Sequence, residues 1–247
     1  MVFSKSIDQA EKVVLVVPIS HTHYLMPPTG LGYLATALRQ SGFNNIAILD
    51  CDKERLSFSD LSDRLKMWRP QVVGFQVFSY NFDSVVKSIE IIKQVSLETV
   101  ILIGGAHVSS TSTTVLEEVK GADYGFAGEG EIGLPMLARR ILRGESMSLE
   151  NIPGLIWREG SSIRNNARAG IEDLDNLGFQ AWDLMPPASY YGSPQGVFYK
   201  RFPIAPISTT RGCPYLCTFC GSGVNMGHKL RLRSMNHVLD EMVMLYK

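Results

Sequence analysis

The chain has 247 residues, of which 45% are hydrophobic and 19% charged, a composition that suits a folded protein of one large or two smaller domains. Its 24 Lys and Arg residues balance its 24 Asp and Glu residues, so its charge does not point to nucleic acid or an anionic membrane surface as a partner. The apolar runs are too short to span a bilayer and residues 1–11 are too polar for a signal peptide, so we expect a cytoplasmic protein.

Residues 12–143 alternate between short apolar stretches rich in β-branched residues and longer stretches with apolar residues at helical spacing. The predicted strands are residues 12–18, 45–50, 71–78, 99–103 and 123–127. The predicted helices are residues 30–41, 61–67, 83–95, 113–120 and 130–143. Five such strand–helix pairs predict an α/β fold: a doubly wound, flavodoxin-like, parallel five-stranded sheet with helices on both faces.

The pattern changes after residue 145. Residues 153–163 predict a small hairpin, and residues 165–203 predict a connector across the surface with Leu174 and Trp182 docked on a core. Farther along, the sequence predicts a strand over residues 204–209 and a helix over residues 236–247. The predicted divisions are a first domain over residues 1–145, a hairpin and connector over 146–203, and a third segment over 204–247.

Three of the four cysteines, Cys213, Cys217 and Cys220, lie within eight residues in the spacing C-x3-C-x2-C. Such clustering indicates a metal site and not a disulfide framework. Three thiolates on one short loop can hold three corners of a cubane iron–sulfur cluster and leave the fourth iron open to a small molecule. The alternative is a zinc site completed by His228, although structural zinc sites usually have two separated ligand pairs. Cys51 ends an apolar run and is expected to be buried.

The cysteine loop resembles the signature of the radical S-adenosylmethionine (radical SAM) superfamily, with Phe219 before the last cysteine and small residues over 221–223 after it. The resemblance implies that Cys213, Cys217 and Cys220 hold a [4Fe–4S] cluster whose open iron binds S-adenosylmethionine. It also implies an external electron donor of the flavodoxin or ferredoxin type. Reductive cleavage of S-adenosylmethionine would then release a 5′-deoxyadenosyl radical that acts on a small-molecule substrate.

Glycines and polar residues recur where the predicted strands of the first domain end. Because the carboxyl ends of parallel strands meet at one edge of a sheet, these residues are expected to lie together and to bind a ligand there. Glycine there lets a large flat ligand approach the backbone, and the start of a helix can hold an anion. The glycines concerned are Gly30, Gly32, Gly104, Gly105, Gly128 and Gly130.

These motifs, which cover most of residues 12–131, resemble the cobalamin-binding domain that precedes the radical SAM domain in B12-dependent radical SAM enzymes. The cofactor-binding residues that the resemblance implies are Thr29, Gly30, Gly32, Ser79, Tyr80, Gly104, Gly105, His107, Gly128 and Glu129. The D-x-H-x-x-G motif that supplies a histidine ligand to cobalt in other cobalamin proteins is absent. The resemblance therefore implies cobalamin with its dimethylbenzimidazole tail displaced and no histidine on cobalt. His107 is expected to orient a loop or to touch the tail.

Together the two resemblances imply a cobalamin-dependent radical SAM enzyme, with methyl transfer to an unactivated carbon as the expected reaction. Oxidative ring closure of a tetrapyrrole-like substrate is the reaction of a related family on the same scaffold. A non-catalytic cobalamin-binding module and a radical SAM enzyme that has lost cobalamin are further alternatives. Residues 204–247 would form only the first unit of the partial (β/α) barrel typical of radical SAM domains, so we expect the 247-residue piece alone to be inactive.

Overall fold

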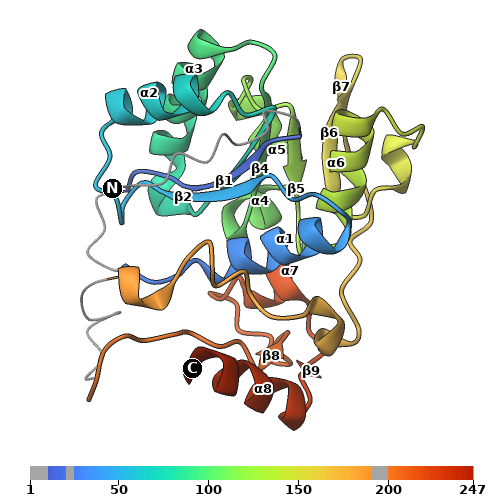
Figure 1. Cartoon of the computed structure of the whole chain (residues 1–247). Coiled ribbons are helices and arrows are strands. Elements are labelled where there is room, and N and C mark those ends of the chain that lie inside the picture. Colours follow the sequence, from blue (N-terminus) through green and yellow to red (C-terminus); the bar gives the residue numbers. More distant parts are fainter. Residues whose placement is uncertain (1–10, 21–24, 191–199, 247) are drawn as a thin grey trace.

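The computed structural model describes residues 11–20, 25–190 and 200–246 (Figure 1). Its central feature is a seven-stranded sheet in the order β2-β1-β3-β4-β5-β6-β7. The strands are β1 Val13–Val17, β2 Ile46–Asp50, β3 Val72–Gln76, β4 Val100–Gly104, β5 Tyr124–Phe126, β6 Leu155–Glu159 and β7 Ser162–Asn165. The first five pair in parallel, which confirms the predicted sheet, whereas β6 and β7 pair antiparallel. The predicted hairpin thus extends the same sheet at its β5 edge.

Helices cover both faces of this sheet. One face carries α1 (Thr29–Gln40) and α6 (Gly133–Arg143). The other face carries α2 (Phe58–Trp68), α3 (Phe82–Val95), α4 (Ala106–Thr111) and α5 (Thr114–Glu118). Strand β1 shows the cause, because successive side chains of a strand point to opposite faces. Val13 and Leu15 join the core beneath α1, and Val14 and Val16 join the core on the opposite face.

The segment after β4 differs from the prediction. A helix was expected only over residues 113–120, but α4 begins directly after Gly105 and is followed by the shorter α5. Gly105 has a φ of +110°, and a Cβ atom there would lie 2.8 Å from the carbonyl oxygen of Val77. Glycine is therefore required for the turn that leads from the sheet into α4. Two short 3-10 turns, η1 Ser79–Asn81 and η2 Leu149–Asn151, complete this part of the chain.

The connector packs along α1. It contains the 3-10 turns η3 Leu174–Leu177 and η4 Pro187–Ser189. Leu174 is buried against Tyr33 of α1, and Trp182 is buried with Met185 and Tyr190. The expectation that Leu174 and Trp182 dock on a core is thus confirmed.

The last segment lies against α1 and the connector (Figure 1). It contains β8 Thr210–Arg211, α7 Ser222–Met226, β9 Arg231–Leu232 and α8 Met235–Tyr246. The helix predicted over residues 236–247 is confirmed by α8, but the strand predicted over 204–209 is wrong. Those residues have no neighbouring strand in the described part of the chain, and the short β8 pairs antiparallel with β9. Within the residues that the structure describes, no helix has the length and apolar character needed to cross a membrane.

Candidate functional site

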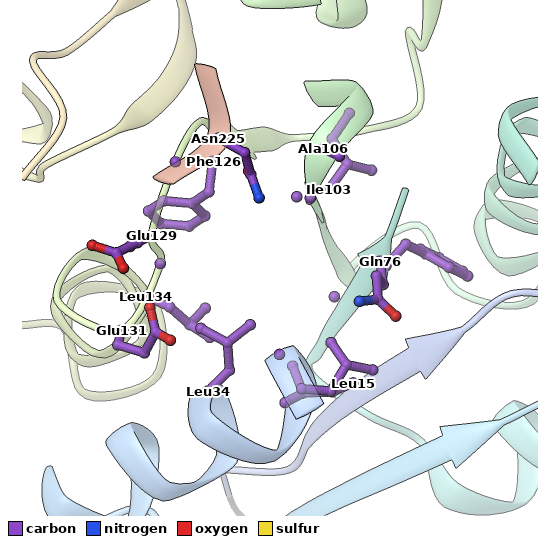
Figure 2. Close-up of a pocket in the computed structure, with 18 of the residues that line it drawn as sticks. Leu15, Leu34, Gln76, Ile103, Ala106, Phe126, Glu129, Glu131, Leu134 and Asn225 are labelled. Carbon is purple, nitrogen blue, oxygen red and sulfur yellow. The ribbon is translucent and has the colours of Figure 1, made fainter. Parts of the chain in front are cut away.

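A cavity of about 320 Å³ opens at the carboxyl edge of β1, β3, β4 and β5, between α1 and α6. Figure 2 shows apolar side chains around it from several elements, among them Leu15, Leu34, Phe126 and Leu134. This volume lies at the lower end of the roughly 300–1,000 Å³ that is usual for small-molecule sites. The arrangement follows from the fold, because ligands of open α/β sheets bind beyond the carboxyl ends of the strands.

Six of the ten predicted cofactor-binding residues line this cavity. They are Thr29, Gly30, Gly104, Gly105, Gly128 and Glu129. At Gly30 and Gly104 an added Cβ atom would come no closer than 3.7 Å to another part of the protein. The fold itself therefore does not demand glycine at these two positions, and their missing side chains leave room for a ligand close to the backbone.

The other predicted cofactor-binding residues lie outside the cavity lining. Gly32 faces the connector, where an added Cβ would lie 2.1 Å from the end of the Met185 side chain. The Ser79 hydroxyl is 3.0 Å from Nδ1 of His107, so these two predicted residues contact each other. Tyr80 is 70% exposed and stacks on Phe78 with the ring centroids 5.6 Å apart.

Two carboxamides add polar groups to the apolar cavity. Gln76 ends β3, and Asn225 lies in α7, the helix that follows the cysteine loop. In Figure 2 the side-chain nitrogen atoms of both residues point into the cavity from different walls. Neither residue was among the sequence candidates. Gln76 stands near the end of a predicted strand and could have been noticed there, whereas nothing in the sequence connects Asn225 with the sheet.

Glu129 and Glu131 are held by arginines from the last segment. Arg211 donates to Glu129 at 2.9 Å and to Glu131 at 2.6 Å, and Arg231 donates to both oxygens of Glu129 at 2.6 and 3.1 Å. All four side chains are only about 6% exposed. Burial alone would raise the pKa of Glu129, but its hydrogen bonds to the two arginines hold that pKa below its usual value. The ionised Glu129 side chain thus links the first domain to the last segment through these ion pairs.

The three clustered cysteines lie on the loop between β8 and α7. Cys213 is partly buried, and Cys217 and Cys220 are exposed. The Cys213 N–H donates to the carbonyl of Gly227 at 3.1 Å, and the Cys220 N–H donates to the carbonyl of Cys217 at 3.2 Å. The Ser222 hydroxyl lies 3.2 Å from the Cys220 sulfur. Hydrogen bonds that Ser222 donates to this sulfur, from its hydroxyl and its backbone N–H, lower the pKa of Cys220 and so favour its thiolate.

The thiol donor set suits an iron–sulfur cluster, because thiolates are the ligands that such clusters use. No group of three or more His, Cys, Asp or Glu side chains is placed to hold a metal ion in residues 11–20, 25–190 and 200–246. Ligation by Cys213, Cys217 and Cys220 therefore stays a prediction. His228, the possible fourth zinc ligand, has its Nδ1 atom 3.2 Å from the carbonyl oxygen of Cys213. Cys51 is fully buried, as expected, and burial raises its pKa.

Comparisons with known proteins identify the family of the chain. The family model described as the B12 binding domain matches residues 15–138, half of the chain. An uncharacterized methyltransferase of Pyrococcus horikoshii is 29% identical over 95% of this chain and 50% of its own length. The anaerobic magnesium-protoporphyrin IX monomethyl ester cyclase of Rubrivivax gelatinosus is 27% identical over 90% of this chain and 39% of its own length.

A solved structure extends the likeness to the fold. The cobalamin-dependent S-adenosylmethionine radical enzyme OxsB, with aqua-cobalamin and S-adenosylmethionine bound, matches with a TM-score of 0.79 at 18% identity. The match covers 95% of this chain and 31% of that one. The chain therefore spans half or less of the length of these relatives. From the matched domain, the shared fold and the cysteine loop, we conclude that this chain belongs to the B12-dependent radical SAM enzyme family.

Proposed function

We propose that this chain is the cobalamin-binding domain and the beginning of the radical SAM domain of an enzyme that methylates an unactivated carbon of a small-molecule substrate. The observation that supports this most is the position of α7. This helix follows the cysteine loop directly and at the same time lines the apolar cavity through Asn225 and Met226. The two proposed cofactor sites are thus neighbours, as a reaction that uses both cofactors requires.

The residues around the cavity fit the tail of cobalamin. Leu34, Phe126 and Leu134 offer apolar surface to the flat dimethylbenzimidazole base, and Gly30 and Gly104 leave the backbone accessible. We therefore expect cobalamin to bind with this base displaced from cobalt and held in the cavity. Bound cobalamin would supply the transferable methyl group, and the cluster would supply the electron that cleaves S-adenosylmethionine.

In this proposal the cluster is held by Cys213, Cys217 and Cys220. The hydrogen bond from Ser222 favours the thiolate form of Cys220, which is the form that binds iron. Electrons would come from an external donor of the flavodoxin or ferredoxin type.

Oxidative cyclisation of a tetrapyrrole-like substrate is the second candidate reaction. It is supported by the likeness to the cyclase of Rubrivivax gelatinosus, which extends over 90% of this chain. Methyl transfer is preferred because the Pyrococcus horikoshii relative, named as a methyltransferase, matches at higher identity and over more of the chain. The two reactions would share the cavity and the cysteine loop, so the substrate distinguishes them.

Retention of cobalamin tests the proposal. We expect the 247-residue chain to bind hydroxocobalamin and to carry it through gel filtration. Gly104→Val would place a branched side chain beside the cavity and should weaken binding about tenfold or more. Gly144→Asn is the control, because this glycine ends α6 in open space with a φ of +65° that asparagine tolerates. If the folded chain does not retain cobalamin, the proposed function is wrong.

A further inference from the structure

The end of α7 forms part of the cavity wall, although α7 belongs to the segment that carries the cysteines. Ser109 is buried, and its hydroxyl accepts from the Gly128 N–H at 2.9 Å. Two acceptors lie within reach of the hydroxyl proton, the side-chain oxygen of Asn225 at 2.8 Å and the carbonyl oxygen of Gly105 at 2.9 Å. The Asn225 amide has its oxygen on the side of Ser109 and its nitrogen toward the cavity (Figure 2). Asn225 therefore offers a hydrogen-bond donor to whatever fills the cavity.

Other contacts fasten the same helix to the cobalamin-binding domain. Arg168 donates to the carbonyl oxygens of Val224 and Ser109, the latter at 2.7 Å. Arg231 donates to the carbonyl oxygen of Met226 at 2.9 Å while it also binds Glu129. Two arginines thus donate hydrogen bonds to backbone carbonyls of α7. One of them, Arg231, also belongs to the buried ion-pair cluster around Glu129.

Both ends of the cysteine loop depend on the position of α7. Cys213 donates its N–H to Gly227, which ends α7, and Cys220 lies two residues before the first residue of α7. An added Cβ at Gly212 would lie 2.1 Å from the carbonyl oxygen of Lys229, so the start of this loop packs tightly against the residues that follow α7. A change in the mobility of α7 must therefore reach the cysteines.

We propose that Asn225 is a positioning residue that couples the cobalamin cavity to the cysteine loop. This inference rests on the proposed function, since it takes cobalamin as the ligand of the cavity. A ligand that accepts a hydrogen bond from the Asn225 amide holds α7 in place and thereby orders the loop of Cys213, Cys217 and Cys220. Because such coupling is reciprocal, order in the loop strengthens cobalamin binding by the same factor.

Hydrogen–deuterium exchange of the 247-residue chain with and without saturating cyanocobalamin tests this coupling. In the unmodified chain we expect cyanocobalamin to slow exchange both over residues 104–110, at the cavity, and over residues 212–229, at the cysteine loop. In Asn225→Ala the loss of one hydrogen bond should raise the Kd for cyanocobalamin about fivefold. At saturation, residues 104–110 should still be protected in this variant, whereas residues 212–229 should gain no protection.

Two further variants separate the donor from the bulk of the side chain. Asn225→Asp keeps the oxygen that Ser109 binds but removes the nitrogen that faces the cavity, so it should behave like Asn225→Ala. Asn151→Ala, an exposed position in η2, is the matched control and should behave like the unmodified chain.

Three outcomes would overturn the coupling. The first is protection of residues 104–110 without protection of 212–229 in the unmodified chain. The second is undiminished protection of the loop in Asn225→Ala. In either of these cases the chain still binds cobalamin, so the proposed function would stand. The third is no retention of cyanocobalamin by the folded chain, which refutes the proposed function and the coupling together.

Discussion

Replacing Glu241 with glutamine should destabilise the protein strongly, although the two side chains have nearly the same shape. Glu241 of α8 is fully buried and forms an ion pair with Arg233, which is 1% exposed, at 2.5 Å. Its other oxygen accepts from the indole N–H of Trp182 at 2.9 Å and, at 3.4 Å, from the backbone N–H of Gln180. Because each of these partners is a donor, a glutamine amide must turn its NH₂ group toward another donor, whichever way it is oriented.

The expected loss follows from these contacts. Glutamine removes the charge that compensates buried Arg233 and also leaves one donor unpaired, and breaking a buried ion pair in this way costs about 3–5 kcal/mol. Arg233 keeps its hydrogen bond to the carbonyl oxygen of Ser208 at 3.0 Å, which places the expected loss toward the lower end of that range. The double variant Arg233→Met with Glu241→Gln should therefore show a coupling energy of at least about 1 kcal/mol.

Urea unfolding followed by far-UV circular dichroism and by tryptophan fluorescence provides the measurement, with Trp182 close to the site of the change. Asp63→Asn serves as the control, because Asp63 and its partner Lys66 are 76% and 58% exposed and this pair should contribute less than about 1 kcal/mol. A change of less than 1 kcal/mol for Glu241→Gln would refute the argument, since it would mean that Arg233 finds adequate compensation elsewhere.

Three further predictions concern other parts of the chain. Burial raises the pKa of Asp50 to about 6, so the folded state binds this proton more tightly than the unfolded state. The free energy of unfolding should thus fall by up to about 3 kcal/mol between pH 4 and pH 7, and Asp50→Asn should abolish that fall in urea titrations; an unchanged pH profile would contradict the assignment. Gly105→Ala should lower the free energy of unfolding by about 2 kcal/mol or more, because its φ is +110° and the added Cβ would meet the Val77 carbonyl; thermal unfolding at an unchanged midpoint would be incompatible with this. Ser222→Ala should raise the pKa of Cys220 and slow its alkylation at neutral pH, measured by mass spectrometry with Cys217 as the internal control; equal rates would show that Ser222 has no such effect.

Much of the sheet could be predicted because its strands are buried on both faces. Short runs such as residues 100–104 consist of apolar residues alone, and such runs separated by helical periods are typical of parallel sheets. The place of the hairpin could not be read in the same way. In the structure Trp157 of β6 lies opposite Tyr124 of β5. This pairing depends on which edge of the sheet is free, and hydrophobic periodicity does not carry this information. The strand wrongly expected over residues 204–209 shows the same limit.

The candidate site was predictable to a similar extent. Glycines at strand ends have a local signal, so Gly104, Gly105 and Gly128 could be placed near the cavity before the structure was known. Contacts across long sequence separations have no such signal. Asn225 reaches Ser109 across 116 residues, and Arg231 reaches Glu129 across 102 residues. These partners come together through tertiary packing, which residue spacing along the chain does not reveal.

The hairpin of β6 and β7 also protects one edge of the sheet against aggregation. Without it, the short apolar strand β5 would end the sheet and present its unpaired backbone groups to other molecules. The hairpin replaces this edge with β7, in which Ser162, Arg164 and Asn165 are exposed and Arg164 pairs with Glu159 at 2.8 Å. A charged, polar edge of four residues is a poor template for strand addition. The hairpin therefore protects the sheet at whose carboxyl edge the candidate cofactor cavity lies.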